Sequence, residues 1–162
     1  MVLKLRNAIL AGPAGAERPL TEAEMIALAK AVELDALDVQ EYCRFRRKCY
    51  TRNTVVLNEH VELVVICWGA NQSSSVHDHG ISNCLYLVTE GTMQEELFRL
   101  EEGKHVRTRS RLWSRGEITV ASGPTIHRIS NPSDNDLFTI HIYSPPLANR
   151  VTHYTPVPTY EA

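Results

Sequence analysis

The sequence contains no long hydrophobic run. Its 162 residues are 43% hydrophobic and 22% charged, as in an ordinary globular protein. No apolar stretch approaches the about 20 residues that a membrane-spanning helix needs. The first ten residues also lack the apolar core and cleavage site of a signal peptide. We therefore expect a cytoplasmic protein without a membrane-spanning segment.

The chain also has little excess of charge of either sign. Its 17 basic and 19 acidic residues give a net charge of -2, so no bulk field would attract nucleic acid or an anionic membrane. It has four cysteines and no CxxC pair, which argues against a structural zinc site. In a chain without a secretory signal we expect these cysteines to be reduced thiols. They are Cys43, Cys49, Cys67 and Cys84.

Internal repeats, low-complexity segments and an evident linker are absent as well. A chain of this length is sufficient for one domain with a sizeable core, so we expect a single domain over residues 1–162. Its N-terminal segment, about residues 1–48, is expected to be partly helical. The glycine, proline and alanine residues of 11–19 indicate a loop within it.

Two helices are predicted in the N-terminal segment. Thr21 and Glu24 form a capping-box pair in front of apolar residues at helical spacing, which predicts a helix over about residues 21–33. A second short helix is expected from Asp38 to Arg46. The basic residues 44–48 are interpreted as its solvated end, where cations suit the helix dipole, rather than as a nucleic-acid patch.

From Tyr50 onward the hydrophobic pattern has a period of two residues, which is typical of strands. Strands are expected over residues 54–57, 61–68, 84–88, 93–100, 105–113, 117–120, 127–129 and 137–143. Many short strands behind a helical segment predict a mainly β protein, a sandwich or barrel of the jelly-roll kind. The barrel would cover about residues 50–147, with residues 148–162 as a tail.

Two histidines, His77 and His79, stand two positions apart in this β-rich region. Side chains alternate across a strand, so we expect both imidazoles on one face. Two neutral imidazoles held side by side are half of a transition-metal site. If the pair is to hold a metal, the rest of the chain must supply further ligands.

The first of two cupin motifs is legible around these histidines. Cupins have His-x-His, then a residue that is usually Glu after four positions, then Gly after six more. In this chain His77, His79 and Gly91 match that motif, and Cys84 stands in the place of the Glu. The resemblance implies that one usual metal ligand of cupins, the carboxylate, is missing.

The second cupin motif has Gly, Pro-x-Gly, His and Asn at fixed spacing. Gly116, His127 and Asn131 match it, while Ser122 and Pro124 stand where Pro and Gly are expected. The resemblance implies a cupin-type jelly-roll β-barrel and makes His127 the third candidate metal ligand. Strand histidines that only pack against neighbours are the alternative, which three histidines in cupin register make much weaker.

Loss of the carboxylate narrows the class further. Three neutral imidazoles leave a divalent metal with its full charge and open positions, which suit a thiolate. Over about residues 45–147 the chain is similar to the cysteine dioxygenase family of thiol dioxygenases. The stretches that carry the similarity are Tyr50-Thr51-Arg52-Asn53, Cys67-Trp68-Gly69, Ser74 to His79, Cys84, His127-Arg128 and Thr139 to Pro146. The similarity implies an Fe²⁺ ion bound by His77, His79 and His127.

The same resemblance implies roles for other side chains. Arg52 would bind the substrate carboxylate through its planar guanidinium, with Tyr50 close by. Thr139, His141 and Tyr143 alternate along one strand and therefore share a face. They would form a relay in which Thr139 orients His141 and His141 hydrogen-bonds Tyr143, whose phenol would lie beside the iron.

Cys84 has two interpretations that the sequence leaves open. In some members of the family the equivalent cysteine forms a thioether with the tyrosine, which here is Tyr143. The alternative is a buried free thiol, because cysteine is among the most buried residue types. The resemblance also implies a cis peptide bond between Ser144 and Pro145.

The implied function is that of a non-haem iron thiol dioxygenase, which oxidises L-cysteine with O₂ to cysteine sulfinic acid. One alternative is the same chemistry on 3-mercaptopropionate or another small thiol, against which Arg52 argues. Others are a non-catalytic ligand-sensing or metal-storing cupin, and a zinc or manganese isomerase cupin, which would normally keep the carboxylate. We expect a monomer with no nucleic-acid or membrane partner.

Overall fold

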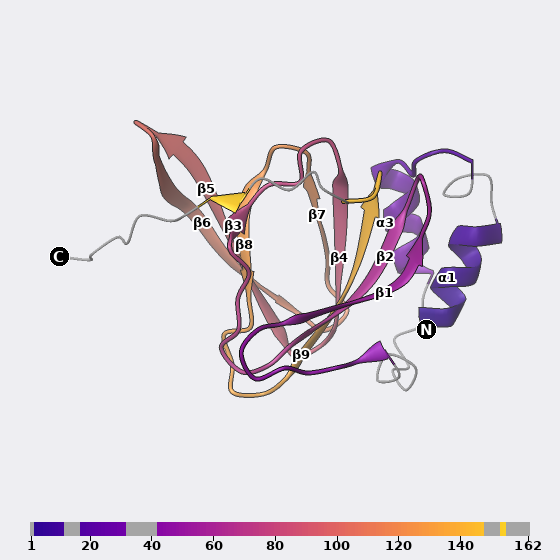
Figure 1. Ribbon diagram of the computed structural model, residues 1–162, viewed down its shortest axis with the longest axis horizontal. Helices are drawn as coiled ribbons and strands as arrows, with labels where there is room; N and C mark the ends of the chain where they lie inside the picture. The colour runs from indigo at the N-terminus through magenta and orange to yellow at the C-terminus, as the bar shows by residue number, and fades with distance from the viewer. Residues whose placement is uncertain (1, 12–16, 32–41, 148–152, 155–162) are drawn as a thin grey trace.

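The computed structural model describes residues 2–11, 17–31, 42–147 and 153–154 (Figure 1). Within these ranges the helices are α1 (Val2–Ala11) and α3 (Glu22–Lys30). The strands are β1 (Thr51–Leu57), β2 (Glu62–Trp68), β3 (Val76–His77), β4 (Asn83–Glu90), β5 (Thr92–Glu101), β6 (Lys104–Ser114), β7 (Ile118–Ser122), β8 (Ile126–Ser130), β9 (Leu137–Ser144) and β10 (His153–Tyr154). None of the described helices is long and apolar enough to cross a membrane.

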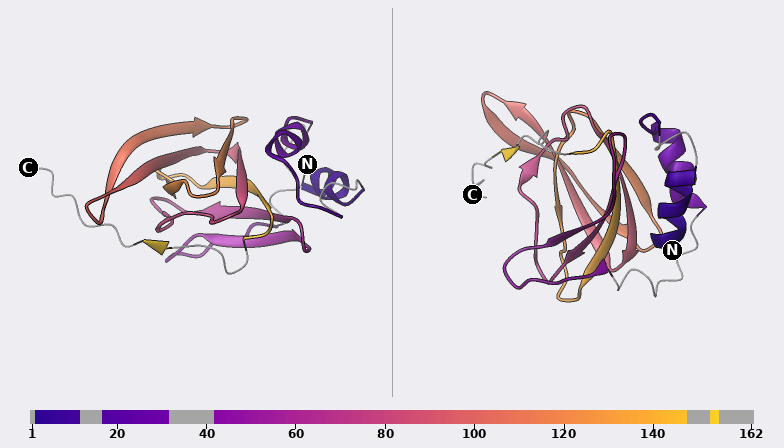
Figure 2. Two further views of the ribbon diagram at one scale, coloured as in Figure 1. Left: turned by 90° about the horizontal axis from the view of Figure 1, so that it is seen from above. Right: turned by 45° about the vertical axis from the view of Figure 1, so that its right-hand side comes forward.

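The strands form two antiparallel sheets of five strands each. The first sheet has the order β1-β2-β9-β4-β7, and the second has the order β10-β3-β8-β5-β6. Figures 1 and 2 show the sheets facing one another, with both helices on the outer side of the first sheet. The β5–β6 hairpin projects beyond the rest of the barrel (Figure 1).

The central strands of the first sheet are buried on both faces, as β2 shows most clearly. All seven β2 residues are buried, and alternate side chains point in opposite directions. Leu63, Val65 and Cys67 belong to the core shared with the helices. Val64, Ile66 and Trp68 belong to the core between the sheets. The core between the helices and the first sheet therefore stabilises the sheet, and side chains on the opposite face of the sheet, between the two sheets, can form a site.

The N-terminal helices agree with the sequence only in part. The capping box at α3 is confirmed: the Thr21 hydroxyl accepts from the Glu24 amide at 3.3 Å, and the Glu24 carboxylate accepts from the Thr21 amide at 2.8 Å. The helix ends at Lys30, and the predicted extension past residue 31 lies outside the described residues. Helix α1 was not predicted, although Val2, Leu5 and Ile9 are its buried face.

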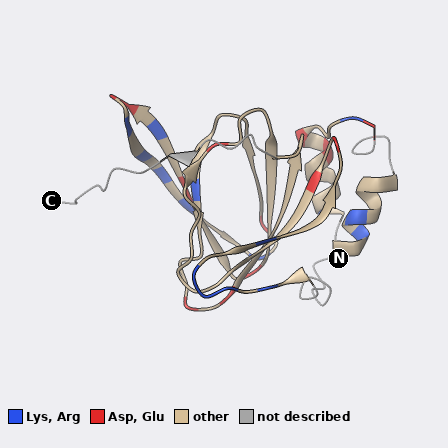
Figure 3. Cartoon of the chain, in the orientation of Figure 1, with Lys and Arg blue, Asp and Glu red and all other residues tan. Residues whose placement is uncertain are grey.

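The second predicted helix is wrong over residues 43–46, whereas Tyr42 before them lies in a 3-10 turn. Residues 38–41 lie outside the described ranges, and residues 43–46 are not helical. Their carbonyl groups have tertiary partners instead: the Thr51 hydroxyl donates to the Arg44 carbonyl, and the Gln72 amide donates to the Arg46 carbonyl at 2.7 Å. The basic residues 44–48 are exposed, as expected, on the loop that leads to β1 (Figure 3).

The predicted strands are present, with ends that shift by up to three residues. The cupin-motif glycine Gly91 forms the turn between β4 and β5 with φ +84°, and a Cβ there would lie 3.0 Å from the Asp136 carbonyl oxygen. Only glycine accommodates both conditions. The predicted cis bond between Ser144 and Pro145 is also present.

Candidate active site

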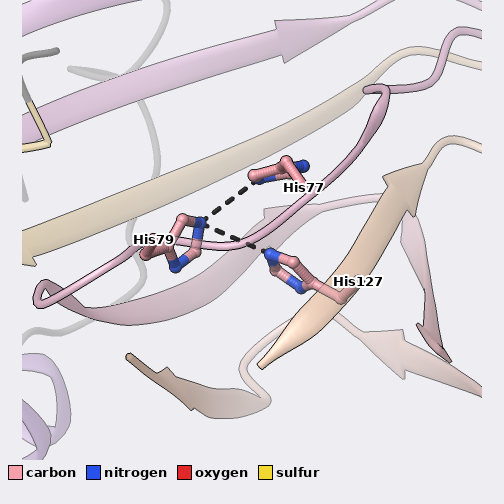
Figure 4. A group of neighbouring side chains, drawn as sticks. All are labelled: His77, His79 and His127. Carbon is pink, nitrogen blue, oxygen red and sulfur yellow. Dashed lines mark hydrogen bonds between the residues drawn. The ribbon is translucent and has the colours of Figure 1, made fainter. Parts of the chain in front are cut away.

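The three candidate ligands come from the second sheet and the turn that follows β3 (Figure 4). His77 ends β3, and its backbone pairs with His127 of β8. We had expected His77 and His79 to share a strand face. They do not, because β3 ends at His77. The Asp78 carboxylate accepts the Gly80 amide at 2.8 Å and closes a turn that carries His79 toward the other two rings.

The Nε2 atoms of the three rings converge on one point. Nε2 of His79 lies 3.3 Å from Nε2 of His77 and 3.4 Å from Nε2 of His127. The ligand atoms of all three lie within 4.8 Å of one another. Three imidazole nitrogens at this spacing repel one another unless they share a proton or a cation, and imidazole is a good ligand for iron, copper and zinc.

The outward nitrogens of two rings are fixed by acceptors. His77 Nδ1–H donates to the Ser75 carbonyl at 2.9 Å, and His127 Nδ1–H donates to the Glu95 carboxylate at 3.2 Å. Glu95 also accepts from Trp113 Nε1–H at 3.1 Å. These bonds place the protons on Nδ1 and leave the Nε2 lone pairs of His77 and His127 facing inward. Sequence reasoning missed Glu95.

His79 is neutral, and its Nε2 faces the Nε2 atoms of His77 and His127. Burial, together with repulsion from His127 and His77, lowers the pKa of His79 to about 2. Its Nδ1 atom is buried and has no hydrogen-bond partner in the described part of the chain. Three imidazoles with converging Nε2 atoms fit a divalent transition metal, so these residues would hold one.

The predicted relay runs across the inner face of β9. The Thr139 hydroxyl lies 2.9 Å from His141 Nε2, and His141 Nδ1 lies 3.0 Å from the Tyr143 hydroxyl. The chain continues at both ends, because Trp68 Nε1–H donates to the Thr139 hydroxyl at 2.9 Å and an Arg52 N–H donates to the Tyr143 hydroxyl at 3.2 Å. All the side chains of the relay itself are buried.

One direction of hydrogen bonding satisfies every donor of this chain. The Trp68 indole can only donate, so the Thr139 hydroxyl accepts from it and donates its own hydrogen bond to His141 Nε2. His141 is neutral, because burial lowers its pKa well below the ordinary value. Its single proton then lies on Nδ1 and is donated to Tyr143. The Tyr143 oxygen accepts from His141 and Arg52, so its own O–H is left as a donor, with the weakly accepting Cys84 thiol in contact.

Arg52 is held by two partners of the first sheet. One N–H group donates to Glu62 at 3.0 Å and another to the Tyr143 hydroxyl, with the guanidinium 5.0 Å from the centre of the Tyr143 ring. Burial alone would lower the pKa of Arg52, but the hydrogen bond to Tyr143 and the charge of Glu62 raise it, so the group is charged. Guanidinium has five N–H donors, and the remaining ones are available to an anionic ligand. Glu62 was not predicted.

Cys84 lies among aromatic hydroxyls on β4. Its backbone pairs with Tyr143 of β9, and its thiol is in hydrogen-bonding contact with the hydroxyls of Tyr143 and Tyr86. Burial raises the pKa of the Cys84 thiol and of both phenols well above their ordinary values. All three are therefore protonated at neutral pH. Tyr86 was not among the predicted site residues.

Tyr50 packs against the core between the sheets, the cluster that also holds Cys84 and Tyr143, and its role in the substrate pocket stays a prediction. Its ring stacks on Trp68 with 4.4 Å between the ring centres, and it makes no hydrogen bond with Arg52 in the described residues. Trp68 in turn donates to Thr139 of the relay. The structure thus places Tyr50 at the Trp68 end of the relay.

A barrel of two facing sheets with three convergent histidines on its inner surface defines a cupin with a metal site. Solved structures support this fold: a cupin superfamily protein from Desulfitobacterium hafniense has a TM-score of 0.53 and 11% identity, over 71% of this chain and 94% of that one. A double-stranded β-helix protein from Klebsiella pneumoniae has a TM-score of 0.56 and 19% identity, over 76% of this chain and 99% of that one. The predicted cupin-type fold is confirmed.

Sequence comparison gives the family. The family model described as cysteine dioxygenase type I matches residues 16–155. Cysteine dioxygenase type 1 of Homo sapiens is 31% identical in an alignment 129 residues long, which covers 76% of this chain and 64% of that protein. The chain belongs to the cysteine dioxygenase type I family, and it spans slightly less than two thirds of the length of these curated relatives.

Proposed function

We propose that the protein is a non-haem iron thiol dioxygenase that oxidises L-cysteine with O₂ to cysteine sulfinic acid. The observation that carries the proposal is the pairing of a carboxylate-free three-histidine site with Arg52 and Tyr143. The Tyr143 ring centre lies 5.4 Å from that of His79, and Arg52 donates to the Tyr143 hydroxyl. Family membership supports the same assignment.

The metal proposed for the three histidines is Fe²⁺. When bound, it would supply a Lewis acid that lowers the thiol pKa and a redox centre at which thiol and O₂ meet. His77, His79 and His127 would hold it through Nε2. The bond from His127 to Glu95 orients the ring and makes its lone pair a stronger donor.

Arg52 would bind the carboxylate of the amino acid. The guanidinium is fixed by Glu62, whose second carboxylate oxygen accepts the Leu147 amide at 3.3 Å, so its remaining N–H groups have a set direction. Two parallel N–H···O bonds to a carboxylate combine charge with orientation. Glu62 also offsets part of the charge of Arg52, which favours a ligand that brings hydrogen-bond acceptors in good geometry.

Tyr143 would act on the reacting end of the substrate. Because its oxygen already accepts two hydrogen bonds, from His141 and Arg52, its O–H remains as a donor, and a polar atom of the bound thiol or of O₂ is a better acceptor for it than the Cys84 thiol in contact. In the overall reaction both oxygen atoms end on sulfur, and the four electrons that reduce O₂ come from that sulfur. No external reductant is needed.

A thioether between Cys84 and Tyr143 is the second part of the proposal. Joining Sγ to the ring carbon beside the hydroxyl removes one hydrogen from each partner, with O₂ as the two-electron oxidant. Backbone pairing of Cys84 with Tyr143 and the contact of their side chains support it. We expect an intact mass two hydrogens below the sequence mass after iron loading in air, and the full sequence mass in Cys84→Ser. An unchanged wild-type mass would contradict the cross-link.

Oxygen uptake by the iron-loaded protein tests the activity. The protein is loaded without air and then given L-cysteine or 3-mercaptopropionate in aerated buffer. We expect uptake of one O₂ per sulfinic acid formed, with higher kcat/KM for L-cysteine. Faster turnover of 3-mercaptopropionate would transfer the assignment to that thiol, and no uptake with either would overturn the dioxygenase proposal.

A further inference from the structure

Tyr86 places a second buried phenol beside the three histidines. It lies on β4, is 1% exposed, and takes no part in the relay of β9. Its hydroxyl lies 3.2 Å from His127 Nε2. Tyr143, by contrast, lies against His79. The two phenols therefore approach the convergent nitrogens from two different histidines.

The direction of the bond between Tyr86 and His127 follows from Glu95. His127 Nδ1–H donates a hydrogen bond to the Glu95 carboxylate, so the neutral tautomer carries its lone pair on Nε2, which accepts from the Tyr86 O–H. This is the lone pair that a metal takes. A metal bound to His127 Nε2 therefore removes the acceptor of the Tyr86 hydroxyl.

Tyr86 has little freedom to turn away when that happens. Its backbone pairs with His141 on one side and with Thr119 on the other, within the first sheet. Its ring meets the His141 ring edge to face, at 4.7 Å and 80°. A buried O–H donor without an acceptor is costly, and the nearby Cys84 thiol is only a weak acceptor.

We infer that Tyr86 is a further ligand-contacting residue of this site, whose hydroxyl donates a hydrogen bond to a small polar ligand bound next to His127. The inference rests on the proposed function and deepens it, since under that function the ligand is the substrate thiol or O₂. It assigns the two phenols to two neighbouring positions. The Tyr143 hydroxyl donates to the ligand near His79, and the Tyr86 hydroxyl donates to the ligand near His127.

The test uses azide as a small anionic probe and Co²⁺ in the three-histidine site, with no thiol present. Azide binding is followed by the visible absorption of Co²⁺ in wild type and in Tyr86→Phe. We expect the azide Kd to rise about tenfold in the variant, as for one lost hydrogen bond to a charged ligand. The Co²⁺ affinity should stay equal or increase, because the hydroxyl no longer competes for the His127 lone pair.

Two results would overturn the inference. An azide Kd equal to that of wild type means that the hydroxyl contacts no bound ligand. Weaker Co²⁺ binding together with unchanged azide affinity at saturating Co²⁺ means that Tyr86 only supports His127. Tyr42→Phe is the matched control, because Tyr42 packs on the core between the helices and the first sheet, and it should change neither constant. If Tyr86→Phe folds poorly, Tyr86→Met, which also lacks the donor, is measured in the same way.

The azide experiment separates this inference from the proposed function. It involves neither thiol nor oxygen consumption, so a protein that oxidises no thiol would still show the effect of Tyr86. Conversely, a protein that oxidises L-cysteine but binds azide equally well with and without the Tyr86 hydroxyl would contradict the inference alone.

Discussion

Arg52 is the residue on which substrate choice depends in the proposed function. It lies at the end of the hydrogen-bonded chain that begins at Trp68, and Glu62 holds it from the other side. Its side chain is 33% exposed, so it can meet a ligand from solvent while its charge is partly desolvated. A hydrogen bond to a charged group contributes about 1.5–3 kcal/mol in such a setting.

We expect Arg52→Ala to raise KM for L-cysteine by about tenfold to a hundredfold, because the carboxylate loses a charged hydrogen-bonding partner. The iron content should equal that of wild type, since no histidine depends on Arg52 for a hydrogen bond. Steady-state oxygen uptake and metal analysis provide the two readouts. Arg99→Ala, which removes an exposed arginine of the β5–β6 hairpin, is the control. Loss of iron in Arg52→Ala would show a structural role instead.

At the scale of the elements, Glu96 joins three strands of the second sheet. It lies on β5 with its side chain 3% exposed, and it accepts from Arg107 of β6 at 2.7 Å and from Arg128 of β8 at 2.7 Å. Burial opposes the charge of Glu96, but the hydrogen bonds from Arg107 and Arg128 prevail and lower its pKa. Figure 3 shows basic residues along this hairpin.

We expect Glu96→Gln to lower the free energy of unfolding by about 1.5–3 kcal/mol at pH 7, the range for hydrogen bonds to a charged group. Because the folded pKa lies below the unfolded value, this contribution is present above about pH 4.5 and is lost as pH falls through the folded pKa. Urea unfolding of both proteins between pH 7 and pH 3 measures it. The difference between them should shrink with falling pH, and Glu101→Gln at the exposed pair with Arg99 should differ little from wild type. A difference independent of pH would exclude an ionic origin.

The sequence predicted those elements whose pattern is local. Period-two alternation predicts most strands, and the capping box at Thr21 predicts the start of α3. The spacing of the cupin motifs predicted the three histidines, because the fold to which these motifs belong pairs β3 with β8. Residues 43–46 do not form the predicted helix, because side chains outside this segment, Thr51 and Gln72, donate hydrogen bonds to its carbonyl groups.

Contacts between residues far apart in sequence could not be predicted in the same way. Glu95 has no local signal that it will accept from His127, and Tyr86 is one of several inward residues of an alternating strand. Glu62 begins a strand that is otherwise apolar, and this isolated carboxylate was the available signal. For α1 the spacing of Val2, Leu5 and Ile9 was a signal that could have predicted the helix.

For the whole molecule, the metal would join parts of the second sheet that few backbone bonds hold. Strand β3 has two residues, and its pairing with β8 is the single register of His77 with His127. A metal bound by His77, His79 and His127 would therefore fasten β3 and its following turn to β8. Binding to the folded state alone adds stability that grows with the free metal concentration.

We expect metal removal to lower Tm by about 5–10 °C relative to protein at a hundredfold excess of metal over Kd, which corresponds to about 2.7 kcal/mol. Thermal unfolding with and without a chelator measures the shift. His127→Ala should show no dependence on metal. His105→Ala, which removes a histidine of β6 outside the cluster, should keep the full shift. An equal Tm with and without metal in wild type would contradict binding at this site.

The two sheets divide the labour of the site. The metal-binding side chains belong to the second sheet and the turn after β3, whereas Arg52, Cys84, Tyr86 and Tyr143 belong to the first. Under the proposed function, metal loading and thiol preference are inherited through different strands and can drift apart. Substitutions on β1, β4 and β9 could therefore change the preferred thiol substrate while the protein keeps the same metal. Substitutions that affect thiol preference and substitutions that affect metal binding should have additive effects where the residues are not in contact.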